Sequence, residues 1–235
     1  MFTLTQIISL ACLIFPTSYS SMISTKKSTV AILGASGYTG AELMRLLTNH
    51  PNIDIKVLTA DRSAGQEFKA IYPQFSYLSH LPRLSKWEES QAEIEKCDIA
   101  FCCLPHGTTQ EIISELSKSS VKIVDLSADF RLRDIESYKT WYGKEHAAPI
   151  LQKEAVYGLT ELNRVNIRKA RILANPGCYP TAAQLPLIPL LKVCFAFFSS
   201  VNLNYTLCFS GRLTLFSTLH LSGWPDFIRR YHHRC

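Results

Sequence analysis

The sequence predicts an α/β protein built on a doubly wound, mainly parallel sheet. Short continuous apolar runs are typical of strands buried on both faces, and they alternate with segments whose apolar residues recur at helical spacing. Strands that alternate with helices form parallel sheets, which bind their ligands at the carboxyl ends of the strands. Polar loops follow the predicted strands and should meet at one such edge: 34–40, 104–107, 127–131 and 175–179.

Composition and charge set the class of protein. The 235 residues are 47% hydrophobic and 19% charged, as in a globular chain able to bury one core, or one and a half. The net charge of +6 comes mainly from the two ends of the chain, outside residues 28–192. We therefore expect no nucleic-acid partner.

A glycine-rich turn follows the first predicted strand, Thr29–Leu33, and precedes a helix that should stop near Asn49 and Pro51. In this setting backbone amides can approach a pyrophosphate at the helix N-terminus, which favours a Rossmann-like nucleotide domain over a plain tight turn. The spacing is GxxGxxG rather than GxGxxG, so the strand and helix around it carry the argument. The candidate cofactor-binding residues of the turn are Gly34, Ser36, Gly37, Tyr38, Thr39 and Gly40.

The second predicted strand, Asp54–Ala60, ends where such domains contact the adenosine ribose. Arg62 and Ser63 would suit a 2′-phosphate, so we expect NADP rather than NAD. Asp61 alone would favour a free 2′-hydroxyl, and a solvated loop charge is the plainer alternative for Arg62.

Cys178 is the candidate nucleophile. It lies between a predicted strand, Arg171–Ala174, and a helix predicted over Thr181–Lys192 with Pro180 near its first turn. A thiol beside helix N-terminal amides is activated as the thiolate, whereas a lone cysteine is more often a buried structural residue. Cys97, Cys102 and Cys103 should be core thiols, and the cysteine spacing predicts no metal site and a reducing compartment.

Further candidates lie in the loops after the middle strands. Pro105 and His106 should line the nucleotide pocket. Arg131 could bind a substrate phosphate or carboxylate, and a surface salt bridge is an equally good interpretation. Ser127 and Asn175 are the remaining substrate candidates.

Five separated motifs resemble one family, N-acetyl-gamma-glutamyl-phosphate reductase, in that family's order over residues 28–192, most closely its plant, plastid-targeted branch. The motifs span residues 34–40, 104–107, 125–132, 156–161 and 175–181. The resemblance implies an NADPH-dependent oxidoreductase of arginine biosynthesis that acts on a small acyl phosphate and forms a homo-oligomer. It implies that the cysteine at position 178 attacks the acyl phosphate to leave a thioester, which hydride converts to N-acetylglutamate 5-semialdehyde. Aspartate-semialdehyde dehydrogenases are looser relatives, and a related semialdehyde dehydrogenase is one alternative. A non-catalytic nucleotide-binding fragment is another.

The expected organisation has four parts. Residues 1–27 form a targeting leader, 28–178 the nucleotide domain, 179–192 the start of a catalytic domain, and 193–235 a poorly ordered tail without resemblance to the family. The resemblance implies a plastid address, and the apolar leader leaves a secretory or cytoplasmic one open. No membrane span is expected.

The resemblance implies a substrate domain and a catalytic histidine, and we expect neither in the tail. Of the core histidines, His146 is the only unassigned candidate for a proton-transfer group. We expect no measurable turnover by the isolated chain, since losing such a group costs about 10²–10⁴ in rate.

Overall fold

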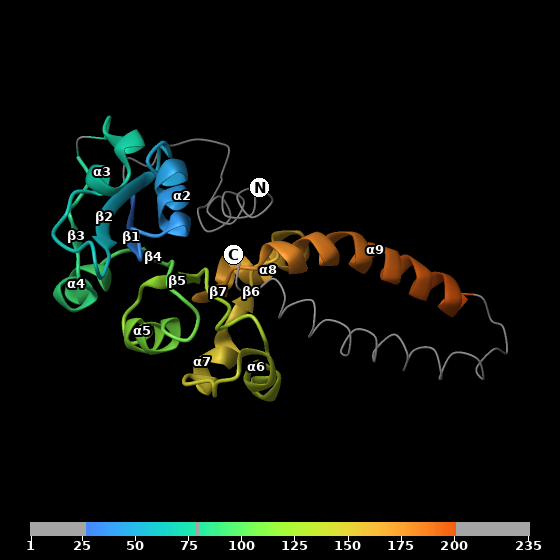
Figure 1. Cartoon of the computed structure of the whole chain (residues 1–235). Coiled ribbons are helices and arrows are strands. Elements are labelled where there is room, and N and C mark those ends of the chain that lie inside the picture. The colour runs from blue at the N-terminus through green and yellow to red at the C-terminus, as the bar shows by residue number, and fades with distance from the viewer. Residues whose placement is uncertain (1–26, 79, 201–235) are drawn as a thin grey trace. The chain divides into compact units, whose positions relative to one another are not determined.

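A computed structural model describes residues 27–78 and 80–200 of the chain (Figure 1). A compact unit extends to Ala182, and a second unit begins at Ala183. The expectations for the leader at 1–26 and for the tail beyond residue 200 fall outside the described residues.

The compact unit contains a seven-stranded sheet in the order β3-β2-β1-β4-β5-β7-β6, and all of its strand pairs are parallel. This confirms the predicted doubly wound fold. The chain runs outward from β1 to β3 in one direction and from β4 to β7 in the other, so the strand order reverses between β1 and β4. The strands are β1 (Ser28–Leu33), β2 (Ile53–Thr59), β3 (Leu84–Ser85), β4 (Ile99–Cys102), β5 (Lys122–Asp125), β6 (Val156–Tyr157) and β7 (Ile172–Ala174).

Helices connect these strands. They are α2 (Tyr38–Leu47), α3 (Phe68–Ile71), the 3₁₀ helix η1 (Pro73–Phe75), α4 (Trp87–Ile94), α5 (Thr109–Leu116), α6 (Ile135–Tyr142), α7 (Pro149–Glu154), α8 (Thr160–Lys169) and α9 (Cys178–Ser200). The sequence placed the helix after Cys178 at 181–192. It instead begins at the cysteine and continues to Ser200, with Pro186 and Pro189 inside it. Among the described residues, no helix is long and apolar enough to cross a membrane.

The side chains of β1 alternate between two apolar cores, as the period of a strand requires. Val30 and Ile32 belong to a core that includes apolar residues of α2, whereas Ala31 and Leu33 belong to one that includes residues of α4 and α5. Helices therefore cover both faces of the sheet. This explains why the central strands are continuous apolar runs.

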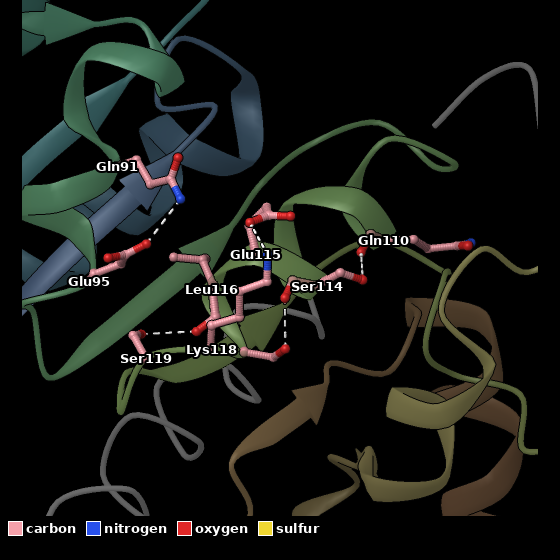
Figure 2. Close-up of polar contacts among 9 residues, drawn as sticks. Gln91, Glu95, Gln110, Ser114, Glu115, Leu116, Lys118 and Ser119 are labelled. Carbon is pink, nitrogen blue, oxygen red and sulfur yellow. Dashed lines mark hydrogen bonds and ion pairs between the residues drawn. The ribbon is translucent and has the colours of Figure 1, made fainter.

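Side-chain hydroxyls satisfy carbonyl groups along α5 and at its end (Figure 2). Ser114 Oγ donates to the Gln110 carbonyl at 2.8 Å, and Ser119 Oγ donates to the Leu116 carbonyl at 2.9 Å. The Arg171 guanidinium, just before β7, donates to the Ser117 and Ser119 carbonyls. The helix is thereby anchored beside the strand that leads to Cys178.

Candidate nucleotide and nucleophile site

Four loops meet at one edge of the sheet, as the sequence predicted. They follow β1, β4, β5 and β7, which are consecutive neighbours in a parallel sheet, so their carboxyl ends point the same way. The first two loops flank the point where the strand order reverses, which is where open α/β sheets bind ligands.

The 34–40 turn brings backbone against backbone at two of its glycines. Gly34 has φ of +76°, and a Cβ built on it would lie 2.5 Å from the carbonyl oxygen of Cys103. A Cβ on Gly40 would lie 2.6 Å from the Cα of Ala35. Because backbone atoms cannot move aside like a flexible side chain, neither position has room for any other residue in this arrangement.

Several backbone amides of the 34–40 turn are unpaired within the described residues and could bind an anion. The amide of Gly37 donates to the Gly34 carbonyl at 3.1 Å, and that of Ala35 donates to the Thr59 carbonyl at 2.8 Å. Other amides of the turn and of the first turn of α2 have no acceptor within residues 27–78 and 80–200: those of Ser36, Tyr38, Thr39 and Gly40. Unpaired amides at a helix N-terminus favour a phosphate group, so the turn fits a dinucleotide pyrophosphate.

Arg62 and Ser63 follow β2, the strand beside β1. The Arg62 side chain is exposed and has no hydrogen bond or ion pair to any described residue. Ser63 is half-buried. The guanidinium is thus available for a charged ligand at the edge where a ribose would lie.

The loop after β4 is tied to the loop after β5. The amide of Ala128 donates to Nδ1 of His106 at 3.0 Å, so the neutral ring carries its proton on Nε2. The amide of Gly107 donates to both carboxylate oxygens of Asp129 at 2.9 Å. Pro105 and His106 are exposed at this edge, on the side where the sequence placed the nucleotide.

Asp125, the last residue of β5, is a fully buried carboxyl group. Its two oxygens accept the backbone amide and the hydroxyl of Ser127, at 2.9 and 2.8 Å. Burial raises the pKa of Asp125 to about 7, against the opposing effect of the Ser127 hydrogen bonds. The loop after β5 is therefore built on a group that titrates near neutral pH.

The hydroxyl of Ser127 is used within this loop. It donates to Asp125 and accepts the amide of Asp129 at 3.1 Å, and Ser127 is 1% exposed. These partners give Ser127 a part in shaping the loop. Its role as a substrate contact stays a prediction.

A buried hydrogen-bond network surrounds Asp129. Tyr138 donates from its hydroxyl to Asp129 Oδ1 at 2.8 Å, and Gln110 Nε2 donates to that hydroxyl at 2.9 Å. Nε2 of His146 donates to the Asp129 carbonyl at 2.9 Å, while its Nδ1 accepts the Ala148 amide at 3.1 Å. Both ring nitrogens of His146 are paired within the described residues and the residue is 7% exposed, so the structure gives no support to this unassigned histidine as a proton-transfer group.

Arg131 links the loop after β5 to the loop that carries Cys178. Its Nε donates to the carbonyl of Asn175 at 2.8 Å, and Nη2 donates to the carbonyl of Leu126 at 3.1 Å. The Nη1 atom lies 3.0 Å from the position that a Cβ on Gly177 would occupy. Arg131 forms no salt bridge with any residue that the structure describes, and its contact with a substrate stays a prediction.

Asn175 is 3% exposed and lies directly after β7. The backbone N–H of Asn175 donates to the Asp125 carbonyl at 2.8 Å. Its side-chain Oδ1 is buried and has no hydrogen-bond partner in the described part of the chain. A buried acceptor left unpaired is costly, which makes the neighbourhood of the candidate nucleophile unusual.

Cys178 is half-buried and begins α9, and its backbone amide has no acceptor among the described residues. The other described thiols differ from it: burial raises the pKa of Cys97 to about 11 and raises the pKa values of Cys102 and Cys103 further. Among these four thiols, Cys178 alone combines partial exposure with a helix N-terminus. No group of three or more His, Cys, Asp or Glu in the described ranges could hold a metal ion.

Two residues of the site were not predicted, Asp125 and Asp129. Both belong to the 125–132 motif, whose pattern alone predicts no role for either carboxyl group. The available signal was one acidic residue at the end of an apolar strand and another in the loop after it, where a buried carboxylate needs hydrogen-bond donors.

Comparison with known proteins agrees with this geometry. The domain family described as "Semialdehyde dehydrogenase, NAD binding domain" matches residues 29–170. The chain is 58% identical over 173 residues to the probable chloroplastic N-acetyl-gamma-glutamyl-phosphate reductase of Oryza sativa, and 55% identical over 179 residues to that of Arabidopsis thaliana. These matches cover 74% and 76% of this chain but 41% and 44% of the relatives, so the chain spans less than half of their length.

Solved structures share the fold. Aspartate semialdehyde dehydrogenase from Candida albicans superposes with a TM-score of 0.50 at 18% identity, covering 71% of this chain and 47% of that one. The Vibrio cholerae aspartate semialdehyde dehydrogenase II has the same TM-score at 19% identity over the same shares. The higher identities to the reductases confirm the resemblance expected from the five motifs. With its parallel sheet, its phosphate-type turn and a family match over more than half of its length, the chain belongs to the semialdehyde dehydrogenase NAD-binding domain family.

Proposed function

We propose that this chain carries the cofactor site and the nucleophile of an NADPH-dependent N-acetyl-gamma-glutamyl-phosphate reductase of arginine biosynthesis. The observation that carries the proposal is the position of Cys178, at the start of α9 and on the same sheet edge as the open amides of the 34–40 turn. A nucleophile and a dinucleotide site on neighbouring strand ends suit acyl transfer followed by hydride delivery. The names of the relatives at 54–58% identity support this substrate.

Cys178 performs the first step as its thiolate. The sulfur attacks the acyl carbon and forms a C–S bond, while the C–O bond to phosphate breaks and its electron pair leaves with the phosphate. The helix N-terminus of α9 stabilises the negative charge that develops on the acyl oxygen. When bound, the reduced dinucleotide supplies the hydride that the acyl group needs to become an aldehyde. The C–S bond then breaks, and Cys178 returns to the thiolate as the semialdehyde leaves.

Arg131 and Asn175 position this chemistry. Arg131 holds the Asn175 carbonyl through Nε, which keeps the turn leading to Cys178 against the loop after β5. Its Nη1 has no acceptor among the described residues and suits an anionic oxygen of the substrate, a phosphate or a carboxylate. Asn175 contributes the carbonyl to which Arg131 donates, and its Oδ1 is buried and unpaired among the described residues in the loop that carries Cys178.

The cofactor is bound by the turn and by the end of β2. The pyrophosphate takes the open amides of Ser36, Tyr38, Thr39 and Gly40, while Arg62 and Ser63 bind the 2′-phosphate of NADP. Pro105 and His106 border the nicotinamide side. The names of the plant relatives further support a plastid location and the function of residues 1–27 as a transit segment.

Acylation of the thiol tests the proposal without requiring turnover. The chain is incubated with N-acetylglutamyl 5-phosphate formed in situ, and peptide masses are mapped. We expect one N-acetylglutamyl adduct on Cys178, release of a matching amount of phosphate, and no adduct in Cys178→Ala. A Cys97→Ala variant is the matched control and should acylate normally. An adduct on Cys97, Cys102 or Cys103 in place of Cys178 would overturn the assignment.

A further inference from the structure

The phosphate-binding turn is held from outside by Tyr72, a side chain to which the sequence assigned no function. Its hydroxyl donates to the carbonyl oxygen of Ser36 at 2.8 Å, across 36 residues of sequence. We propose that Tyr72 is a positioning residue that keeps the amides of the 34–40 turn open for the cofactor pyrophosphate. This inference rests on the proposed dinucleotide site and adds to it a residue that would not touch the ligand.

The Ser36 carbonyl matters because of what it would otherwise accept. In a helix extended by one residue at its N-terminus, the amide of Gly40 would donate to the carbonyl four residues earlier, which is that of Ser36. The Gly40 amide makes no such bond, and the Ser36 carbonyl faces Tyr72 instead. By holding this carbonyl in the orientation that faces its own hydroxyl, Tyr72 leaves the Gly40 amide for a ligand.

The same hydrogen bond fixes one peptide plane from both sides. The peptide between Ser36 and Gly37 has its carbonyl on Tyr72 and its N–H on the Gly34 carbonyl at 3.1 Å. A peptide with both polar groups paired cannot rotate without breaking two bonds. The neighbouring amides of the turn are therefore held in one orientation before a ligand arrives, which reduces the entropy that binding must overcome.

Tyr72 is itself firmly placed. It lies between α3 and η1, and its ring packs on Phe68 and Phe75 at centroid distances of 5.2 and 6.4 Å. Both phenylalanines are buried, at 2% and 5% exposure, in the core that also contains the buried residues of α2. Burial raises the pKa of the Tyr72 hydroxyl, so the group remains a donor at physiological pH. The 68–75 segment thus supports the turn through one hydrogen bond, from the Tyr72 hydroxyl to the Ser36 carbonyl oxygen.

The test is removal of that oxygen in the full chain, by Tyr72→Phe. Calorimetry should show weaker binding of NADP, NAD and ADP-ribose, each by about fivefold, the value expected for one hydrogen bond. Adenosine 2′-phosphate, which lacks the pyrophosphate, should bind the variant and the wild type equally. Tyr77→Phe is the matched control, because it also deletes a tyrosine hydroxyl beside Phe75. Tyr77 is 63% exposed, and its hydroxyl has no hydrogen-bond partner in the described chain.

A purely structural role for Tyr72 would lower affinity for every ligand alike, or for none, and either result would overturn the proposal. Amide hydrogen exchange of the ligand-free chain gives an independent measurement. In Tyr72→Phe the Gly40 amide can pair with the released Ser36 carbonyl, so its exchange should slow relative to wild type. Unchanged exchange at Gly40 would overturn the positioning role of Tyr72, whether or not the wild type binds a dinucleotide. Failure of the wild type to bind any dinucleotide would contradict only the proposed function.

Discussion

The turn at 34–40 and the loops at 125–131 and 175–178 lie on one edge of the same sheet but are held by different means. The turn is fixed by close backbone contacts at Gly34 and Gly40 and by hydrogen bonds to uncharged groups. The other loops are fixed by charged side chains, with Asp125 and Asp129 accepting backbone amides and Arg131 donating to backbone carbonyls.

The difference suits what each region is proposed to bind. A turn of neutral backbone groups leaves its positive potential for the pyrophosphate and does not change with pH. The loops around Cys178 depend on buried charges, so their arrangement should respond to pH and to the removal of single charges. The site therefore joins a rigid half, the 34–40 turn, and a charged half, the loops at 125–131 and 175–178.

The largest effect should come from adding one methyl group to the rigid half. In Gly34→Ala the Cβ would meet a backbone carbonyl at 2.5 Å and the residue would keep a positive φ. We expect a loss of about 3 kcal/mol in unfolding free energy, from strain and overpacking together, and no detectable NADP binding. Urea unfolding and calorimetry measure the two.

Gly65→Ala is the matched control, because Gly65 has a φ of +82° and nothing lies within 4 Å of its Cβ position. It should lose only the conformational part, about 1 kcal/mol, and bind NADP normally. Equal losses in the two variants would show that close packing does not hold the turn.

The charged half should lose less when Arg131 is replaced. Arg131→Met keeps most of the side-chain stem but removes the donors to the Asn175 and Leu126 carbonyls. We expect unfolding free energy to fall by roughly 2–3 kcal/mol and Cys178 to react more slowly with iodoacetamide. Arg133→Met removes the same charge from an exposed side chain without a described partner and should change neither. A stable Arg131→Met variant with an unchanged alkylation rate would show that the hydrogen bonds of Arg131 do not position the loop that carries Cys178.

The pH dependence of stability separates the two halves directly. The pKa of Asp125 is about 7 in the folded chain and about 3.9 when unfolded. Between these values the folded state holds a proton that the unfolded state has released, so this group's contribution to stability falls as pH rises toward 7 and is constant above it. Asp129 opposes ionisation of the carboxyl, together with Cys102 and Cys103 whenever these are thiolates, while Arg131 favours it.

Asp125→Asn removes this titration. The unfolding free energy of the variant minus that of wild type should rise by about 2 kcal/mol from pH 5 to pH 7. Urea unfolding at several pH values measures this difference. Using the difference between the two proteins cancels the other titrating groups. A difference that stays constant with pH would mean that Asp125 does not titrate in this range.

The sequence predicted the rigid half better than the charged half. An apolar strand, a glycine-rich turn and an amphipathic helix are local patterns, and β1, the turn and α2 lie where they were expected. Cys178 between a strand and a helix is equally local. The two-residue strands β3 and β6 were not predicted, because a pair of residues has no measurable period.

The charged half depends on contacts between distant segments. The Gly107 amide meets Asp129 because β4 and β5 are neighbours, and Gln110 of α5 meets Tyr138 of α6 through a hydrogen bond between separate helices. Nothing in the spacing of these residues indicates which backbone amide a buried carboxylate will accept. His146 shows the same limit, since its two backbone partners became visible only in the fold.

The smallest expected effect concerns cofactor choice, the one feature of the rigid half that depends on a charged side chain. Arg62 is exposed, and its guanidinium has no partner in the described chain, so replacing it should not disturb the fold. In Arg62→Ala we expect NADP affinity to fall about tenfold, as for one charge-assisted contact, while NAD affinity stays within twofold. Lys86→Ala is the control, because Lys86 follows β3 at the same edge and its loss removes the same charge. If both variants lowered the affinity for NADP equally, the preference for NADP would reflect the overall positive electrostatic potential at this edge of the sheet. If neither did, or if wild type bound NAD as tightly as NADP, Arg62 would not read the 2′-phosphate, and specificity would have to come from another residue near the ribose.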